Sequence, residues 1–306
     1  MQNSRFIISS LCLFMLTLGL VSCRYETNSQ TSTDNHKKTL NVMSFNIRYG
    51  DADDGENSWP NRKDMVCDFI GEQKPDIAGL QEALNYQIDT IIAANPDYAF
   101  VGVGRNDGKK AGEFCPVLYR RDIFTKAESG TFWLSDTPSV PGSITWGNAC
   151  SRICTWVRLL DRRGRGFYVY NLHLDHVGQL SREKSVLQVT EKIASRQHPQ
   201  DMFILMGDFN AGENNLAIQY LKGSAQIDGR SNPLPMADTF RQIHPEEEIV
   251  GTFGGFTGKI DGDKIDYIFV SPQTQTKSAD ILHTNKDGRY PSDHYPVTAQ
   301  IRLNNK

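Results

Sequence analysis

The chain has 306 residues, of which 39% are hydrophobic and 23% are charged. This composition is typical of a folded globular protein and argues against an intrinsically disordered one. The formal net charge of −3 at pH 7 lacks the basic excess that non-specific binding of duplex nucleic acid requires. The length predicts one large domain or two ordinary ones.

The first 22 residues have the layout of an export signal. Arg5 gives a positive start, and the run from Phe6 to Val21 is almost entirely apolar. This run is too short for a comfortable transmembrane helix, which needs roughly 20 residues. The sequence Leu20-Val21-Ser22-Cys23 resembles the bacterial lipoprotein box, and the resemblance implies a lipid on Cys23. An ordinary signal and an uncleaved anchor are the alternatives.

The domain organisation follows from this leader. We expect a signal peptide over residues 1–22, a flexible polar tether over residues 23–38 and one catalytic domain over residues 39–306. The product would be an exported, monomeric lipoprotein, periplasmic or on the cell surface, that touches the membrane only through its N-terminal lipid. The mature domain also contains four cysteines without zinc-site spacing, which the sequence leaves open as thiols or disulfides: Cys67, Cys115, Cys150 and Cys154.

Strand and helix patterns alternate along the mature chain. Alternating or continuous apolar residues predict strands over residues 40–46, 76–81, 98–103, 114–119, 153–160, 167–174, 202–206, 265–270, 279–283 and 296–301. Helical spacing predicts helices between Pro60 and Pro75 and over residues 86–94, 179–197 and 214–221. Many strands with helices at intervals indicate sheets covered by helices.

The strongest local motif is Met206-Gly207-Asp208-Phe209-Asn210, directly after an apolar strand. Residues two apart on a strand share a face, so we expect Asp208 and Asn210 to project together. Gly207 leaves room for a close approach. A carboxylate beside a carboxamide suits a divalent cation and a phosphoryl oxygen. Taken alone, the motif fits a turn with Asx caps equally well.

Two further motifs lie near the C-terminus. The segment Ser292-Asp293-His294-Tyr295-Pro296 offers a carboxylate for a hard cation and an imidazole for acid–base chemistry. Asp266 heads an apolar strand, where a carboxylate is costly unless it is paired. A histidine partner would justify it, as in a carboxylate–imidazole dyad.

Polar side chains also end three earlier strands. Asn46 ends the first strand and Glu82 follows the second, where a carboxylate suits a magnesium site. Asn171 and His173 share one face of the strand over residues 167–174. Taken alone, Glu82 also fits a surface residue, and His173 fits a core histidine with its hydrogen bonds satisfied.

The order of these motifs resembles the endonuclease/exonuclease/phosphatase superfamily over about residues 39–303. The resemblance implies an α+β, four-layer α/β/β/α sandwich with two central, mostly antiparallel mixed sheets flanked by helices. It also implies a phosphoric ester hydrolase that depends on Mg²⁺ or Mn²⁺. Glu82 would then be the principal metal ligand, with Asn46 and Asp293 close by.

The resemblance also implies roles around the phosphate. Asp208 would orient or deprotonate the attacking water, and Asn210 would donate a hydrogen bond to the phosphate. His294 would pair with Asp266. His173 would be a donor to the scissile phosphate. In the deoxyribonuclease branch a glutamate before an apolar strand braces that histidine, and Glu113, ahead of residues 114–119, fits that position.

Substrate contacts are expected from three loops, over residues 102–112, 134–152 and 251–262. Arg152 is the preferred phosphate contact, because a fixed guanidinium binds phosphate through two hydrogen bonds. Asn171 and Trp146 are further candidate substrate-binding residues. The expected activity is hydrolysis of a phosphoester, preferably a phosphodiester, from small or lipid-derived molecules. A scavenging nuclease and a non-catalytic, lipid-anchored binding protein on the same fold are the alternatives.

Overall fold

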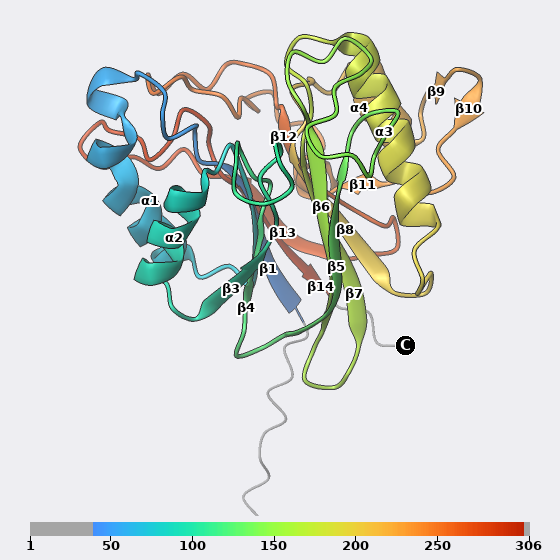
Figure 1. Cartoon of the computed structure of the whole chain (residues 1–306), viewed down its shortest axis with the longest axis horizontal. Coiled ribbons are helices and arrows are strands. Elements are labelled where there is room, and N and C mark those ends of the chain that lie inside the picture. The colour runs from blue at the N-terminus through green and yellow to red at the C-terminus, as the bar shows by residue number, and fades with distance from the viewer. Residues whose placement is uncertain (1–38, 303–306) are drawn as a thin grey trace, which may run out of the picture. The chain divides into compact units, whose positions relative to one another are not determined.

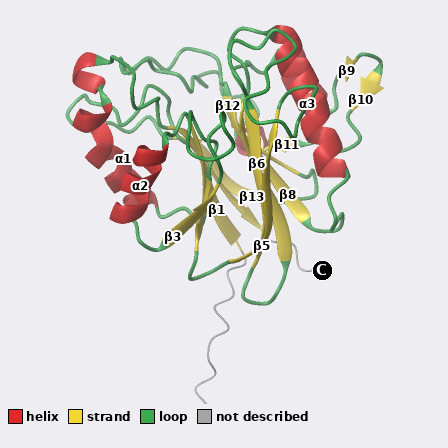
Figure 2. Cartoon of the chain, viewed as in Figure 1, coloured by secondary structure: helices red, strands yellow, loops and turns green. Residues whose placement is uncertain are grey.

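The computed structural model describes residues 39–302. The expected signal peptide, tether and lipidated Cys23 lie outside the described residues. Within the described chain, two six-stranded sheets pack face to face, and helices cover their outer faces (Figures 1 and 2). The expected four-layer sandwich is therefore confirmed. No helix in this part of the chain is long and apolar enough to cross a membrane.

The first sheet has the strand order β13-β14-β1-β2-β4-β3. Its strands are β1 (Thr39–Asn46), β2 (Ile77–Gln81), β3 (Tyr98–Val101), β4 (Val117–Arg120), β13 (Thr276–Ile281) and β14 (Val297–Arg302). Of its strand pairs, β1–β2 is parallel and the others are antiparallel. Its outer face packs on helices α1 (Trp59–Gln73) and α2 (Asn85–Ala94), with the short 3₁₀ helix η1 (Gly55–Asn57) ahead of α1.

The second sheet has the order β11-β12-β8-β7-β6-β5. Its strands are β5 (Thr125–Trp133), β6 (Ile153–Leu160), β7 (Gly166–His173), β8 (Met202–Asp208), β11 (Ala237–Asp238) and β12 (Asp266–Val270). Only β7–β8 is parallel among its pairs. The remaining elements are α3 (Gln179–Ala194), α4 (Leu216–Lys222), α5 (Thr239–Ile243) and the β9–β10 hairpin (Gln226–Ile227 and Arg230–Ser231).

Period-two alternation explains why the interface between the sheets is apolar at one end and polar at the other. On β1, Leu40 and Val42 point into the apolar cluster between the sheets, and Asn46 continues the same face. On β8, Ile204 and Met206 enter that cluster, and Asp208 continues their face. The polar ends of the inner strand faces therefore meet at one end of the sandwich.

Six elements were not expected from the sequence: η1, β5, β9, β10, β11 and α5. β5 was missed because only Phe132 and Trp133 of its nine residues are buried and it pairs only with β6 at the sheet edge. α5 was not expected either, because five residues are too few for helical periodicity to show. The four cysteines of the described chain are free thiols, and Cys150 is the only one of them that is not buried.

Candidate active site

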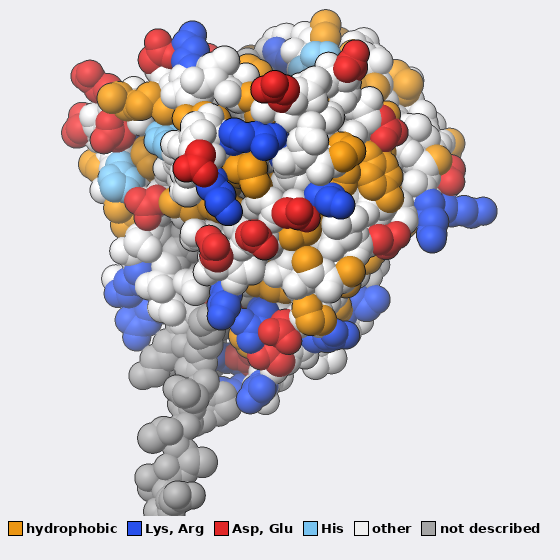
Figure 3. Space-filling model, turned by 90° about the vertical axis from the view of Figure 1, so that its left-hand side faces the viewer, with side chains coloured by type: hydrophobic (Ala, Val, Ile, Leu, Met, Phe, Trp, Pro, Cys, Tyr) orange, Lys and Arg blue, Asp and Glu red, His pale blue; other side chains and the backbone are white. Residues whose placement is uncertain are grey.

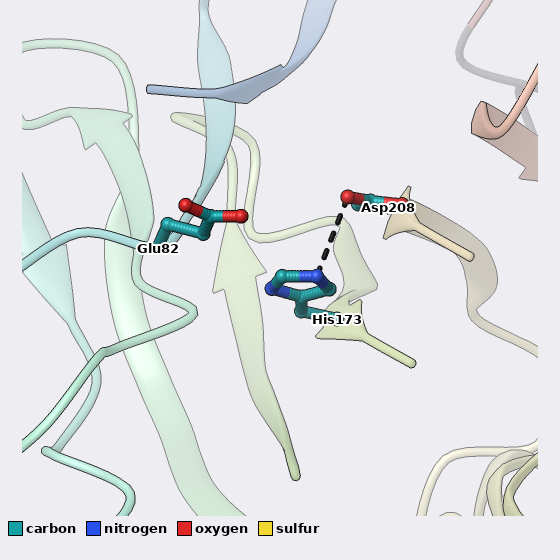
Figure 4. A group of neighbouring side chains, drawn as sticks. All are labelled: Glu82, His173 and Asp208. Atoms are coloured by element: carbon teal, nitrogen blue, oxygen red, sulfur yellow. Dashed lines mark ion pairs between the residues drawn. The ribbon is translucent and has the colours of Figure 1, made fainter. Parts of the chain in front are cut away.

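A cavity of about 620 Å³ lies at the polar end of the sandwich. Glu82, His173 and Asp208 line it and converge from the ends of β2, β7 and β8 (Figure 4). One ligand atom from each of the three lies within 4.8 Å of the others. The cavity therefore gathers side chains that are 35 or more residues apart in the sequence, and it does so because parallel neighbours end at the same sheet edge.

Glu82 follows β2 in a left-handed backbone conformation, with φ of 60°. Non-glycine residues rarely adopt this conformation, and where they do it is often at a functional site. Its carboxylate accepts hydrogen bonds from Asn46 Nδ2 at 3.0 Å and from the Tyr49 amide at 2.8 Å. Burial alone would raise the pKa of Glu82, but the Asn46 bond and the positive His294 hold it below its usual value. Glu82 is therefore ionised at neutral pH.

Asp208 ends β8 and is almost fully buried. Its Oδ2 accepts from Asn46 Nδ2 at 3.0 Å, and its Oδ1 accepts from the Asn210 amide at 2.8 Å. Burial and the neighbouring Asp266 carboxylate raise the pKa of Asp208 to about 7. A carboxylate with that pKa is suited to exchange a proton with water at physiological pH.

Asn210 lies near Asp208 for a different reason than strand alternation. β8 ends at Asp208, and Asn210 lies beyond it in a left-handed conformation, with φ of 47°. Its side-chain amide donates to the Leu174 carbonyl at 3.0 Å. The preceding Gly207 is required, because a Cβ there would lie 2.0 Å from the Leu172 carbonyl oxygen. The expected proximity is present, but a turn produces it.

Asp266 and His294 form the implied dyad. His294 Nδ1 lies 2.9 Å from Asp266 Oδ2, and its Nε2 lies 3.8 Å from Asp208 Oδ2. Asp266 stands directly opposite Asp208 in the β8–β12 pair, so two buried carboxylates face one imidazole. Burial would lower the pKa of His294, but Asp266 and Asp208 hold it well above its usual value. His294 is therefore a cation at neutral pH.

His173 is neutral instead. Burial and the positive Arg152 hold its pKa well below the usual value. Its Nε2 lies 2.9 Å from Asn210 Nδ2 and 3.3 Å from Asp208 Oδ2. The shorter contact favours a ring that accepts from Asn210, which places the proton on Nδ1. That nitrogen is buried and has no partner within the described chain.

The donors around Glu82 fit a divalent cation. Asp293 is nearly buried, and burial together with the nearby Glu82 carboxylate raises its pKa. Arg48 Nη1 lies 3.6 Å from Asp293 Oδ2, and the same guanidinium hydrogen-bonds to Asp54. The cationic His294 also acts to lower the pKa of Asp293. The carboxylates of Glu82 and Asp293 are the hard oxygen donors that Mg²⁺ or Mn²⁺ prefers.

Asn46 takes a different position from the one expected of a ligand. Its amide nitrogen donates to both Glu82 and Asp208, and its oxygen accepts from the Arg48 amide at 3.0 Å. In this structure Asn46 therefore bridges the two carboxylates, and its oxygen is turned away from them.

Glu113 does not brace His173. It lines the cavity, but its carboxylate binds Arg105 through both oxygens, at 2.6 and 2.7 Å. The loop over residues 102–112 carries Arg105 close enough to take this carboxylate. The inference from the deoxyribonuclease branch is corrected on this point.

Asn171 and Trp146 do not line the cavity. Asn171 is fully buried between the sheets, where it donates to the Leu80 and Pro116 carbonyls and accepts from Gln81. Its hydrogen-bonding groups are thus used in joining the two sheets. Trp146 donates to Asp136 on the far side of its loop. The expectation of substrate contact from either residue is not supported by their positions.

The three expected substrate loops all contribute to the lining, with Arg105, Arg152 and Phe253 among their residues. Arg152 is buried, lies 3.4 Å from Asp175 and contacts His176 Nδ1 at 2.8 Å. The ring of Phe253 is half exposed and packs edge-on against His294, with centroids 5.1 Å apart.

Arg62 is a residue that sequence reasoning missed. It lies on α1, is 1% exposed, and donates to the carbonyls of Asn57, Ile47, Arg48 and Pro291. These carbonyls belong to the segments that carry Asn46 and Asp293, so Arg62 fixes the loops behind the acidic donors. No motif marked it, because its partners are backbone atoms far apart in the sequence.

Residues 43–294 match the Endonuclease/Exonuclease/phosphatase family. A crystal structure of an endonuclease/exonuclease/phosphatase from Bacteroides vulgatus is 35% identical with a TM-score of 0.80, covering 88% of this chain and 100% of that one. A mannosyl-6-phosphatase from Bacteroides thetaiotaomicron is 31% identical with a TM-score of 0.76, covering 86% and 100%. An uncharacterized protein of Acanthamoeba polyphaga mimivirus is 30% identical over 166 residues, covering 52% of this chain and 61% of the viral protein.

Proposed function

This chain belongs to the Endonuclease/Exonuclease/phosphatase family, and from that membership and its cavity we propose that it hydrolyses a small phosphate ester with a divalent cation. The observation that carries the proposal is the convergence of Glu82, His173 and Asp208 within 4.8 Å at one cavity. Family members are phosphoester hydrolases. A site that has lost its catalytic role would lack at least one of these groups. All three are present here, which argues against the binding-protein alternative.

The chain's own residues divide the reaction between them. Asp208, with its pKa near 7, accepts a proton from the attacking water while Asn46 and Asn210 hold its two oxygens. The cationic His294, fixed by Asp266, stabilises negative charge that develops on the phosphoryl oxygens.

Glu82 and Asp293 would hold the cation, which supplies Lewis-acid stabilisation of the phosphoryl charge when bound. Hydrogen bonds from the Asn46 side chain and from the Tyr49 amide hold the Glu82 carboxylate in place. The neutral His173 offers its Nδ1–H group as a hydrogen-bond donor. Because the ring is neutral, it adds no positive charge beside the cation. No covalent intermediate on a side chain is required.

We favour a phosphomonoester of a small molecule over the phosphodiester expected from the sequence. A volume of about 620 Å³ falls in the range of small-molecule sites. The Bacteroides thetaiotaomicron relative, matched over its full length, is a mannosyl-6-phosphatase. Phe253 at the rim offers an apolar face against which the organic part of such a substrate can pack. We also propose that the protein acts outside the cytoplasm, because of its leader.

The test is a hydrolysis screen with the purified full chain. Mannose 6-phosphate, other sugar phosphates, a chromogenic phosphodiester, sphingomyelin, plasmid DNA and RNA are compared with Mg²⁺, with Mn²⁺ and with EDTA. We expect release of phosphate from monoesters that EDTA abolishes and that H294Q reduces by orders of magnitude. Cleavage of nucleic acid alone would support the nuclease alternative. Activity that survives both EDTA and H294Q would contradict the proposal.

A further inference from the structure

The end of the sandwich opposite the catalytic cavity is basic. It consists of the loops over residues 74–76, 95–97, 120–124, 161–165, 195–201 and 271–275, together with the described chain ends at Thr39 and Arg302. We call it the basic end. Eight Lys and Arg and five Asp stand on it, although the whole chain has 33 basic and 36 acidic residues. Figure 3 shows Lys and Arg side chains gathered toward this lower end.

Most of the aspartates at the basic end are already used within it. Asp122, Asp161 and Asp201 each accept hydrogen bonds from a neighbouring arginine. Asp76 is fully buried. Asp122 and Asp161 are paired with Arg120 and Arg165 of the same end, so these two pairs are neutral and the positive excess rests on the remaining Lys and Arg.

Three arginines of the basic end donate their hydrogen bonds to backbone oxygens, within the described residues. Arg121 donates to the Pro96 carbonyl, and Arg162 donates to the Asp122 carbonyl at 2.7 and 3.1 Å. Arg196 donates to carbonyls at the end of α3 and in the loop after it. A guanidinium held by carbonyls keeps its full charge. The loops thus present fixed cations, two of them on exposed side chains.

A second cavity, of about 550 Å³, lies at the basic end. Its lining includes Arg158, Arg165 and Arg196, of which Arg158 is paired with the lining residue Asp201 and Arg165 with Asp161. The guanidinium of Arg196, held by backbone carbonyls, suits an anionic head group. Several lining residues come from the starts of β7 and β8, whose other ends carry His173 and Asp208, so this cavity is separated from the catalytic one by the length of these strands.

We propose that the basic end lies on an anionic lipid surface and that the catalytic cavity consequently opens away from the membrane. β1 begins at the basic end, so the expected tether over residues 23–38, with the expected lipid on Cys23, would join the domain on this face. Attraction of basic loops to anionic lipid acts within a Debye length, about 8–10 Å at moderate salt. The basic end must therefore be the face that lies next to the membrane. The proposal does not depend on which ester the cavity hydrolyses.

The test measures backbone hydrogen–deuterium exchange of the full chain on vesicles. The protein is reconstituted into phosphatidylcholine vesicles with or without phosphatidylglycerol. We expect slower exchange in residues 120–124 and 161–165 only on the anionic vesicles, with the protection lost at high salt. Residues 251–262 at the catalytic rim should exchange equally on both. Equal exchange of the basic loops on both kinds of vesicle would overturn the proposal.

A charge-reversal pair makes the test specific. K74E/R121E/R162E removes exposed cations from the basic end, and K63E/K184E/R230E makes the same change in charge on α1, α3 and β10. The first variant should lose the protection from exchange, because each substitution should weaken binding to the anionic vesicles by roughly fivefold. The second variant should keep the protection. Equal loss in both would assign the effect to net charge and contradict a defined surface. Protection by duplex DNA but not by anionic vesicles would assign the basic end to nucleic acid and also overturn the proposal.

Discussion

The two sheets bring different chemistry to one cavity. The first sheet contributes carboxylates that suit a cation, from Glu82 after β2 and from the segment before β14 that carries Asp293. The second contributes the groups that handle protons, with Asp208 and His173 at the ends of adjacent strands. In the proposed reaction, neither sheet alone would hold both the cation and the attacking water. The reaction therefore depends on how the sheets pack, and variants in the two halves should fail in different ways.

The two halves also rest on different buried cations. Behind the first sheet, Arg62 donates its hydrogen bonds to carbonyl groups and forms no ion pair within the described residues. Behind the second, the fully buried Lys264 lies 2.5 Å from Asp238 and 3.7 Å from Glu213. Arg241 binds Glu213 through both oxygens and extends this cluster. Support for the second half therefore depends on ionised carboxylates, whereas support for the first half does not.

The largest expected effect comes from the second half. D208N removes the proton acceptor and should reduce kcat by about 10³-fold. Excess Mg²⁺ should not restore the rate, because the cation is held by the other sheet. The measurement is kcat as a function of metal concentration, with circular dichroism to show that the fold is retained. Recovery of the rate at high Mg²⁺ would break the assignment of separate tasks to the two sheets.

A smaller effect is expected from the first half. E82Q removes a charged ligand and should raise the Mg²⁺ concentration for half-maximal activity by roughly 10- to 100-fold. Here high metal should recover most of the rate, in contrast to D208N. E56Q, an exposed glutamate on η1, is the matched control and should leave metal activation unchanged. An unaltered metal requirement in E82Q would remove Glu82 from the metal site.

The link between the sheets can be tested at Asn171. N171L removes one buried hydrogen bond each from the Leu80 carbonyl, the Pro116 carbonyl and the Gln81 amide, which should cost about 2 kcal/mol of unfolding free energy. Urea denaturation measures it, with the exposed N214L as the control. We expect kcat to fall as well, since both halves shift. A stable N171L would mean that apolar packing alone sets the distance between the sheets.

The smallest effect concerns pH. Burial would raise the pKa of Glu213, but Arg241 and Lys264 hold it below its usual value. A lowered carboxyl pKa stabilises the fold above the unfolded-state pKa, and that contribution is lost as pH falls through the lowered value. E213Q should therefore reduce Tm at neutral pH by roughly 2–4 °C, for about 1 kcal/mol.

The difference in Tm between E213Q and the parent chain should shrink as the pH falls from about 6 to about 3. Thermal melts across that range check the prediction. A constant difference would show that Glu213 contributes packing rather than charge, and it would remove the contrast between the two buried cations.

The sequence alone determined which face each strand end presents. Alternation along β1, β7 and β8 places Asn46, His173 and Asp208 on inner faces, and their order along the chain identified the family. A period of two residues is a local property, so it can be seen without knowing the neighbours of a strand. The principal site residues were accessible for this reason, whereas the four-layer sandwich was implied by the family resemblance that their order carries.

Only the tertiary structure decided which residues contact one another. Strand order places Asp266 opposite Asp208 and makes His294 a cation between them. Loop packing brings Arg105 against Glu113, and the two side chains form an ion pair. These contacts arise between segments far apart in the chain, and short-range periodicity carries no information about them. The sequence therefore determined on which face of its strand a side chain lies. The packing of the sheets decided which residue that side chain contacts, and through that contact its charge.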